Sequence, residues 1–574
     1  MVFFGLPLVA SGAGCGLVLG LGDFTEGSGT STGGGGGGAA TSSSTGGTGG
    51  GASATSGGTG GMPPMPCMPM ATQTCYSGAA GTEGKGLCKG GMETCKDDGT
   101  GFGACVGEVV PTPENCAAPQ DEDCNGTAPQ CTGTSQWGNR FGNAVGDQGA
   151  NGVALDSKGN TIISGLLSGA VDFGAGNPTT GTAYLTKLDP AGATVFSKAL
   201  PIGGLMAVDS ADDVVLVGHF SGALDFGGGK LDTPGADNIY LAKLAPDGTH
   251  LVSKTIGSGS FTLYDMATGP DGSVFIAGII KGIADLGGGP LGVASTYGAF
   301  VAKYDKNGAH VYSRRYGTVG SVGGALAGAI AIDGSGDAVI AVGGMYGGIV
   351  DFGGKKLDSA NGGFAVVGID PVGNVLYADQ FAGGSNSGIN AGLVDASMSV
   401  ILPGNYDIAV DPTGSVFLAG DFTGSTSIGA PALTSKGNKD IFIAKLDPMG
   451  TPVWSKSFGS AGDQIATHIA VDMFGNPGVT GVFPDNLNLG NGVFLSGGVT
   501  GQHVFGLKLD TDGNLLWAHG STDALTTKIQ GPEVAMNALG DVVFSGAIKS
   551  QFTFGMVPAP AGGFFDTYVA KLAP

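Results

Sequence analysis

Residues 409–459 read AVDPTGSVFLAGDFTGSTSIGAPALTSKGNKDIFIAKLDPMGTPVWSKSFG, and this stretch decides the fold. Four short apolar runs lie in it or at its edge: Ile408–Val410, Val416–Ala419, Ile441–Leu446 and Val453–Phe458. Two of the turns read D-P-x-G, at Asp411–Gly414 and Asp447–Gly450, as type I turns prefer. Apolar runs of this length separated by tight turns predict a small antiparallel sheet of four strands.

The same unit recurs along the chain after about Trp137. The apolar residue that follows the "AK" of each copy serves as the anchor, and successive anchors are 56 to 77 residues apart. The anchors are Leu188, Leu244, Tyr304, Ile369, Leu446, Leu509 and Leu572. Seven copies of about 60 residues predict a repeat architecture with about 28 strands.

Two further marks recur at this period. An Asp-Phe-Gly-like triplet begins at Asp172, Asp225, Asp285, Asp351, Ser427, Asn488 and Thr553. An aspartate ends the first strand of five copies, at Asp156, Asp209, Asp333, Asp411 and Asp472, and Gly269 and Asn537 replace it in the other two. Recurrence indicates structural turns of the Asx type rather than a catalytic or metal-binding triplet.

The two ends of the repeat region complement each other. The seventh copy stops at Tyr568–Leu572 and lacks the turn and fourth strand of the other copies. Trp137–Gly142, at the front, has the same Trp-to-Phe-to-Gly spacing as the fourth strand at Trp454–Gly459. We therefore predict an all-β fold, a seven-bladed β-propeller of four-stranded antiparallel blades over residues 134–574, which the N-terminal strand closes by completing the last blade.

These residues resemble the seven-bladed β-propeller repeat of secreted and surface-anchored bacterial proteins, often called the SBBP or beta-propeller repeat family. The shared pattern is approximately A-V-D-x-x-G-N-V-Y-V-x-G, D-F-G, D-x-F-V-A-K-L-D-x-x-G and W-x-x-x-F-G, and the resemblance covers Trp137–Pro574. The fourth copy departs from it at Gly368, where Lys is usual, and the sixth at Phe483–Gly498. The resemblance implies a fold and an exported location but no reaction.

Composition limits the partners. The chain has 25 basic and 47 acidic residues among 574, a formal charge of −22, and 115 glycines. Such an acidic chain repels phosphate backbones, so we expect no nucleic acid partner and regard divalent cations as better candidates.

Residues 1–24 form the expected signal and anchor region. MVFFGLPLVASGAGC is a short apolar run that ends in small residues before Cys15, as in lipoprotein signals, where that cysteine is acylated. A plain secretory signal is the alternative. No later stretch has about 20 uninterrupted apolar residues, so the lipid would be the only membrane contact. The expected location is the cell envelope, as an outer-membrane or surface lipoprotein, or the extracellular space.

Residues 25–66 are almost entirely Gly, Ser, Thr and Ala in their first part, and they predict a disordered linker. A flexible chain of this length reaches roughly 30–40 Å. That reach suits a domain held away from a membrane.

Residues 67–133 form the expected cysteine-rich module. Its eight cysteines are Cys67, Cys75, Cys88, Cys95, Cys105, Cys116, Cys124 and Cys131. An even count in a short segment behind an export signal predicts four disulfides, although the sequence does not choose among about 105 pairings. Zinc is the less favoured alternative, because there is no C-x-x-C and no nearby His. The segment resembles the cysteine-rich modules of bacterial surface proteins that are described as metal-binding.

Within this module, Asp121, Asp123 and Asn125 fit the first half of a calcium loop, D-x-[DN]-x-[DN]-G. Thr132 stands where such a loop has its bidentate Glu. Calcium is therefore the cofactor that the sequence suggests, and an acidic turn between two disulfide-bonded cysteines is the alternative.

The repeats contain no H-E-x-x-H, P-loop or dinucleotide motif, and their histidines are scattered. Two places remain for a ligand. One is the long loop at residues 384–405, where Asp395 would lie in a binding lid. The other is the pair of Gly-Asp-Gln loops at Asp147 and Asp463.

The sequence thus favours a non-enzymatic, exported, lipid-anchored surface protein whose monomeric propeller binds a protein, a glycan or an envelope component. One alternative is an exported lyase or hydrolase with its site at the channel mouth. The other is a calcium-dependent surface scaffold.

If Cys15 is acylated, Cys15→Ser should move the protein from the membrane fraction to the soluble exported fraction, because the lipid is then lost. Immunoblots of fractionated cells measure this, with Thr41→Ala in the linker as the matched control. A Cys15→Ser protein that stays with the membranes would rule out acylation at this residue.

Overall fold

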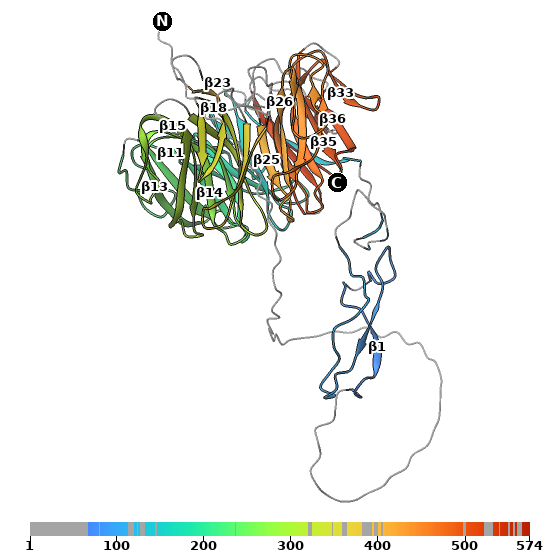
Figure 1. Ribbon diagram of the computed structural model, residues 1–574. Coiled ribbons are helices and arrows are strands. Elements are labelled where there is room, and N and C mark those ends of the chain that lie inside the picture. Colours follow the sequence, from blue (N-terminus) through green and yellow to red (C-terminus); the bar gives the residue numbers. More distant parts are fainter. Residues whose placement is uncertain are drawn as a thin grey trace, which may run out of the picture. The chain divides into compact units, whose positions relative to one another are not determined.

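The structure is a computed structural model of the whole chain (Figure 1). It describes residues 67–574 except 80, 113–119, 123, 125, 127–131, 144–145, 236, 319–323, 347, 359–363, 382–392, 395–399, 403–405, 498–500, 522–531, 539, 549–551, 555–556 and 560–564. The described residues form strands and turns and contain no helix. Accordingly, no helix with the length and apolarity of a membrane span occurs in this part of the chain.

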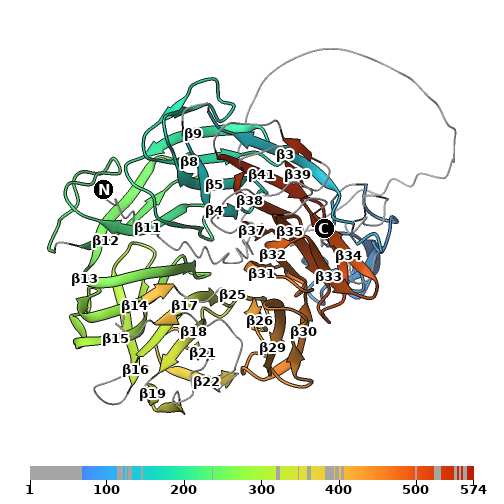
Figure 2. The same cartoon turned by 90° about the horizontal axis from the view of Figure 1, so that it is seen from above.

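The chain divides into two compact units. The larger unit lies within Ala128–Pro574, and its sheets surround a common axis in a β-propeller-like arrangement (Figure 2). The smaller unit lies within Gly20–Thr112 and Asp121–Thr127.

Four copies of the repeat each form a separate four-stranded antiparallel sheet from consecutive chain segments. The first copy contains β4 (Gly149–Leu155), β5 (Thr161–Leu166), β8 (Ala183–Leu188) and β9 (Thr194–Leu200). The fourth contains β17 (Gly324–Ile332), β18 (Ala338–Tyr346), β21 (Phe364–Ile369) and β22 (Val375–Phe381). The fifth contains β25 (Tyr406–Val410), β26 (Val416–Phe422), β29 (Asp440–Leu446) and β30 (Pro452–Phe458). The sixth contains β31 (Ile465–Val471), β32 (Pro477–Pro484), β35 (Gln502–Leu509) and β36 (Leu515–Gly520).

The second and third copies share one nine-stranded sheet. The second copy contributes β10 (Leu205–Val208), β11 (Val214–Phe220), β12 (Asn238–Leu244) and the first half of β13 (His250–Thr268). The third contributes the rest of β13, β14 (Val274–Asp285), β15 (Pro290–Tyr304) and β16 (His310–Thr318). The hairpin of β19 (Ile349–Phe352) and β20 (Lys355–Asp358) extends this sheet at β16. The 19-residue β13 is thus the last strand of one copy and the first of the next.

The sheet of the seventh copy joins the two ends of the repeat region. Its strands are β37 (Glu533–Met536), β38 (Val542–Ile548), β41 (Asp566–Leu572) and β3 (Ser135–Phe141). β3 pairs antiparallel with β41, with Trp137 opposite Lys571 and Phe141 opposite Thr567. The expected pairing of Trp137–Gly142 with Tyr568–Leu572 is therefore confirmed.

Short hairpins lie between the second and third strands of several copies. They pair β6 (Ala170–Val171) with β7 (Thr179–Thr180), β27 (Ser425–Thr426) with β28 (Leu433–Thr434), β33 (Asn486–Gly490) with β34 (Val493–Ser496), and β39 (Phe552–Phe554) with β40 (Val557–Ala559). Another hairpin, of β23 (Leu393–Val394) and β24 (Val400–Leu402), lies between the fourth and fifth copies.

The apolar core consists of layers between neighbouring copies. Buried residues of the fourth copy pack on those of the fifth, as Val366 and Leu418 do. The first and seventh copies share a layer in the same way, with Ile163 beside Val543 and Val569. The innermost strands contact one another in the order β4, β10, β13, β17, β25, β31, β37 and β4 again. Burial of apolar area between sheets is the main force that holds such an array together.

The recurring aspartates form Asx turns, as predicted. In the first copy, Asp156 Oδ1 accepts hydrogen bonds from the Lys158 and Asn160 N–H groups at 3.0 and 2.9 Å. The Asp-Phe-Gly-like triplets do the same, since Asp172 Oδ1 accepts from the Gly174 N–H at 2.8 Å. These carboxylates therefore replace missing backbone acceptors in tight turns.

Aromatic residues of the outer strands lie on turn glycines of the next copy. The Trp137 indole N–H donates to the Pro190 carbonyl at 2.9 Å, and a Cβ at Gly192 would lie 2.7 Å from the indole ring. Gly192 has φ +85°, so the turn needs glycine both for its conformation and for this contact. Trp517 of the sixth copy lies in the same way on Gly133, just before β3.

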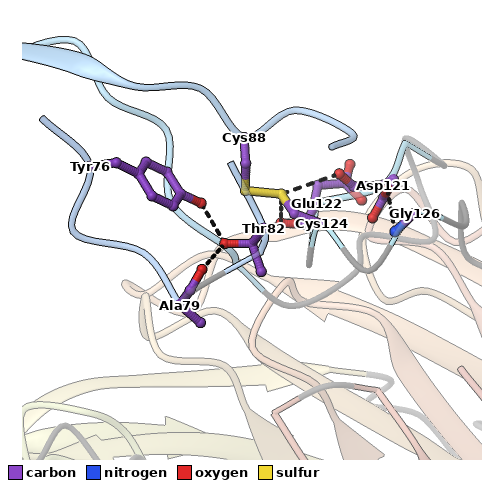
Figure 3. Close-up of a disulfide and its surroundings, with 8 residues drawn as sticks. All are labelled: Tyr76, Ala79, Thr82, Cys88, Asp121, Glu122, Cys124 and Gly126. Carbon is purple, nitrogen blue, oxygen red and sulfur yellow. Dashed lines mark hydrogen bonds between the residues drawn. A yellow bond between two sulfur atoms is a disulfide. The ribbon is translucent and has the colours of Figure 1, made fainter. Parts of the chain in front are cut away.

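The smaller unit depends on disulfides. It has one two-stranded sheet, β1 (Thr72–Cys75) and β2 (Gly91–Thr94), and the bonds Cys67–Cys95, Cys75–Cys105 and Cys88–Cys124. Figure 3 shows the third, next to Asp121 and Glu122. Disulfide bonding is confirmed for these six cysteines, and Cys116 and Cys131 lie outside the described residues.

Trp137→Ala should destabilise the larger unit by roughly 2–3 kcal/mol, somewhat less than for a fully buried Trp, because it removes both the contact with Gly192 and the hydrogen bond to Pro190. Denaturant unfolding followed by circular dichroism measures the change. Val195→Ala, at an exposed outer-strand position, is the control and should change stability by less than about 0.5 kcal/mol. Equal stability of the two variants would show that β3 does not hold the ends together.

Candidate functional site on the axis of the larger unit

One register position of the innermost strands carries a buried ionisable side chain in four copies. In these copies it is Asp265, Asp407, His468 or Glu533, each at most 7% exposed. Strand pairing shows the equivalence, because these residues face Ala277, Ala419, Thr480 and Ser545 at matching places in the second strands. The other three copies have Gly152, Leu205 and Ala329 at this position.

Asp265 and Asp407 bridge neighbouring copies. Asp265 accepts hydrogen bonds from the Met266 N–H at 2.7 Å and from the Ile330 N–H, in the next copy, at 2.8 Å. Asp407 likewise accepts from the Ile408 N–H at 2.8 Å and the Ile469 N–H at 3.0 Å. An innermost strand is a sheet edge with unpaired N–H groups, and a carboxylate can satisfy two of them from two sheets.

His468 and Glu533 form a second link, between the sixth and seventh copies. His468 Nδ1 lies 3.0 Å from the Pro532 carbonyl, which can only accept, so Nδ1 carries a hydrogen. His468 Nε2 lies 3.5 Å from Glu533 Oε2. Both side chains are less than a tenth exposed.

The pKa of Glu533 is raised well above its ordinary value. Burial is the main cause, and the charges of Asp407 and Asp265 add to it. The pKa of Asp407 is also raised, again by burial, and the His468 charge opposes the shift. A protonated Glu533 can donate its hydroxyl hydrogen to His468 Nε2 whenever that nitrogen carries no hydrogen.

Among these axial residues, His468 and Glu533 form the pair suited to proton transfer. A neutral carboxylic acid beside an imidazole is a proton donor and acceptor pair of the kind used in general acid–base catalysis. Asp265 and Asp407 already use their oxygens to hold the innermost strands. In the described part of the chain, no three His, Cys, Asp or Glu side chains are grouped to hold a metal ion.

The sequence-predicted loop residues lie elsewhere. Asp147 is exposed and accepts a hydrogen bond from the Phe565 N–H at 3.0 Å, which ties the loop after β3 to the segment before β41. Asp463 is exposed, whereas its neighbour Gln464 is buried and donates its N–H to the Lys439 carbonyl at 2.8 Å. Asp395, proposed for a lid, lies outside the described residues.

The suggested calcium loop and the lipid site are only partly visible. Asp121 Oδ2 accepts a hydrogen bond from the Gly126 N–H at 2.9 Å, which closes the turn. Asp123 and Asn125, the other suggested ligands, and the acylation site Cys15 lie outside the described residues.

Sequence reasoning missed the axial residues, although a signal exists. Asp407, His468 and Glu533 each stand four residues before the turn residue that ends the first strand. Asp265 stands four residues before Gly269, which replaces that turn residue. Aligning the copies on this turn would have placed the four side chains at one level.

Comparisons with known proteins add little. No protein-family model matches the chain, and no curated protein matches it. Among solved structures, it is similar to a gluconolactonase from Xanthomonas campestris (12% identity, 63% of this chain and 90% of that chain, TM-score 0.26). It is also similar to the calcium-binding protein regucalcin from Agrobacterium tumefaciens (12%, 60% and 85%, 0.27) and a Synechocystis apocarotenoid oxygenase (13%, 64% and 70%, 0.30). Likeness at this level carries no argument about function.

Glu533→Gln should stabilise the larger unit increasingly as the pH rises. A carboxyl whose folded pKa is raised favours folding below its unfolded pKa and loses that contribution as the pH rises through the folded pKa. The variant's advantage should therefore grow by about 1.4 kcal/mol per pH unit above roughly pH 4.5, up to the folded pKa. Urea unfolding at several pH values measures the difference.

Asp463→Asn, an exposed change in the same unit, is the control for general effects of charge. A Glu533→Gln advantage that did not change with pH would contradict the raised pKa.

Proposed function

We propose that this chain is an exported, lipid-anchored surface protein, and that its larger unit is a closed seven-bladed β-propeller. Closure is supported by the pairing of β3 with β41 and by the core layer between the first and seventh copies. Export is supported by the three disulfides, which form and persist in oxidising compartments. The linker at residues 25–66 would hold the folded units away from the lipid at Cys15.

In this proposal the propeller is not an enzyme and binds a protein, a glycan or an envelope component. The observation that carries it is the hydrogen bonding of Asp265 and Asp407. Each carboxylate accepts one N–H from its own strand and one from the next copy, so two of the three axial carboxylates serve the scaffold. The axial carboxylates would stabilise the fold, and the ligand would bind at the outer surface and loops.

A second candidate is an exported lyase or hydrolase. It is favoured by His468 and Glu533, which place an imidazole and a carboxyl of raised pKa 3.5 Å apart on the axis. In such an enzyme this pair would move a proton, and a substrate would have to enter the channel.

One experiment separates the two candidates. Labelled full-length protein should bind saturably to envelope preparations, and unlabelled protein should compete. The double variant His468→Gln/Glu533→Gln should bind equally well, because the axis takes no part in binding. Binding that is absent or cannot be saturated would contradict the proposal.

The same two proteins are then assayed on lactones, esters and polysaccharides. Turnover by the unmodified protein that the double variant loses would support the enzyme instead. Circular dichroism confirms that the double variant is folded.

A further inference from the structure

A lysine of the third strand is buried against the turn aspartate in several copies. Lys187 Nζ lies 2.8 Å from Asp156 Oδ2 and donates to the Pro246 carbonyl at 3.0 Å. Lys508 Nζ lies 3.2 Å from Asp472 Oδ2. In the second copy Lys243 Nζ lies 2.5 Å from Asp209 Oδ2. In the seventh copy, where Asn537 replaces the turn aspartate, Lys571 Nζ instead lies 2.9 Å from Asp541 Oδ2, four residues further on. Each of these positions is a cation site built from carboxylate oxygens, and a backbone carbonyl completes it in the first, second and sixth copies.

The fourth copy keeps the carboxylates and lacks the lysine. Gly368 faces Val339 in the register where Lys445 of the fifth copy faces Phe417. A Cβ at Gly368 would lie 2.3 Å from the Tyr377 ring, so this ring covers the place where the lysine side chain would begin.

Asp333 retains its turn without a cationic partner. Its Oδ1 accepts hydrogen bonds from the Ser335 and Asp337 N–H groups at 2.8 and 2.9 Å. No described lysine or arginine forms an ion pair with it, unlike Asp156 or Asp472.

A second carboxylate in the same surroundings is also uncompensated. Asp337 occupies the place of Asp213 and Asp541, which contact lysines at 3.7 and 2.9 Å. Burial raises the pKa of Asp337, the charges of Asp333 and Asp370 raise it further, and only Lys303 opposes the shift. Negative charge thus exceeds positive charge here.

Two buried phenol groups near these carboxylates lack a hydrogen-bond partner among the described residues. Tyr377 and Tyr312 are 7% and 5% exposed, and their hydroxyl groups have no hydrogen-bond partner within the described structure. Burial raises the pKa of Tyr377, and Asp379 and Asp333 are among the charges that raise it further. For Tyr312, burial is again the main cause, and Asp337 contributes. Buried hydroxyls normally have partners, so these two oxygens are available for a bound group.

A hollow borders Asp333, although Asp337 and Tyr377 do not line it. Asp333 and Asp411 line it together with Thr268, Ile332 and Val410. No described lysine forms an ion pair with Asp411 either, and Lys445 Nζ donates to Thr511 Oγ1 at 2.7 Å. Two neighbouring turn carboxylates without lysines therefore share one opening.

We propose that the fourth copy binds a divalent cation, Ca²⁺, at Asp333 in place of the missing ammonium group. Asp337 and the Tyr377 hydroxyl oxygen would complete the protein ligands, together with water. Calcium accepts six to eight oxygen ligands of mixed type, so a site with two carboxylates suits it. The same position in other copies already selects positive charge.

Terbium tests this site, because a bound Tb³⁺ emits after excitation of a nearby tyrosine. The full-length protein should give saturable emission that Ca²⁺ displaces. Asp333→Asn should weaken Tb³⁺ binding at least tenfold. Gly368→Lys should abolish Tb³⁺ binding, because the new ammonium group supplies an internal cation. The variant places a lysine opposite Tyr377, as Lys303 lies opposite Tyr312 in the third copy.

Two variants serve as controls. Asp189→Asn alters a different, exposed Asx turn, the one after the third strand of the first copy, and should leave the emission unchanged. Asp121→Asn tests the loop of the smaller unit. The proposal is overturned if the intact protein gives no saturable emission, if Asp333→Asn has no effect, or if only Asp121→Asn removes it. Should Gly368→Lys fail to fold, Asp333→Asn still decides.

Discussion

The pairing of β3 with β41 is the interaction on which the larger unit depends. It joins residues more than 400 positions apart, and the entropic cost of such a closure grows only by about 0.6 kcal/mol for each doubling of length. The pairing brings the first copy against the seventh, so that Ile163 packs beside Val543. It also places Trp137 on Gly192. Without it, β37 and Glu533 would have no fixed position relative to β4.

Buried charge obeys one rule through most of this unit. A charge removed from water costs several kcal/mol unless hydrogen bonds or an opposite charge compensate it. Lys187 with Asp156 and Lys508 with Asp472 meet the rule by ion pairing. Asp265 meets it through two backbone N–H groups. Because the repeat usually compensates its charges, the places that do not are informative.

The sequence predicted the features that depend on residues recurring at the repeat period. Strand order, the Asx turns and the pairing of the two ends follow from residues that recur at fixed spacing, such as Asp156 and Trp137. It did not predict that β13 continues as one strand, because Gly257 and Gly259 resemble turn residues. The disulfide partners were also unpredictable, since pairing depends on tertiary contacts. The axial set was missed because Asp407 and His468 differ in chemistry and only their register is shared.

Glu533 and Asp333 are two exceptions to the charge rule that differ in access, and access determines what each can do. Glu533 is 2% exposed on the axis, where a proton is the natural compensating cation because it needs no room. Asp333 borders a hollow that solvent reaches, so an ion with its own water can replace the lost lysine there. The charge of −22 also favours cation uptake at the surface. If the proposed metal site exists, one repeat unit therefore provides a proton-binding position at Glu533 and a metal-binding position at Asp333, where the lysine is missing.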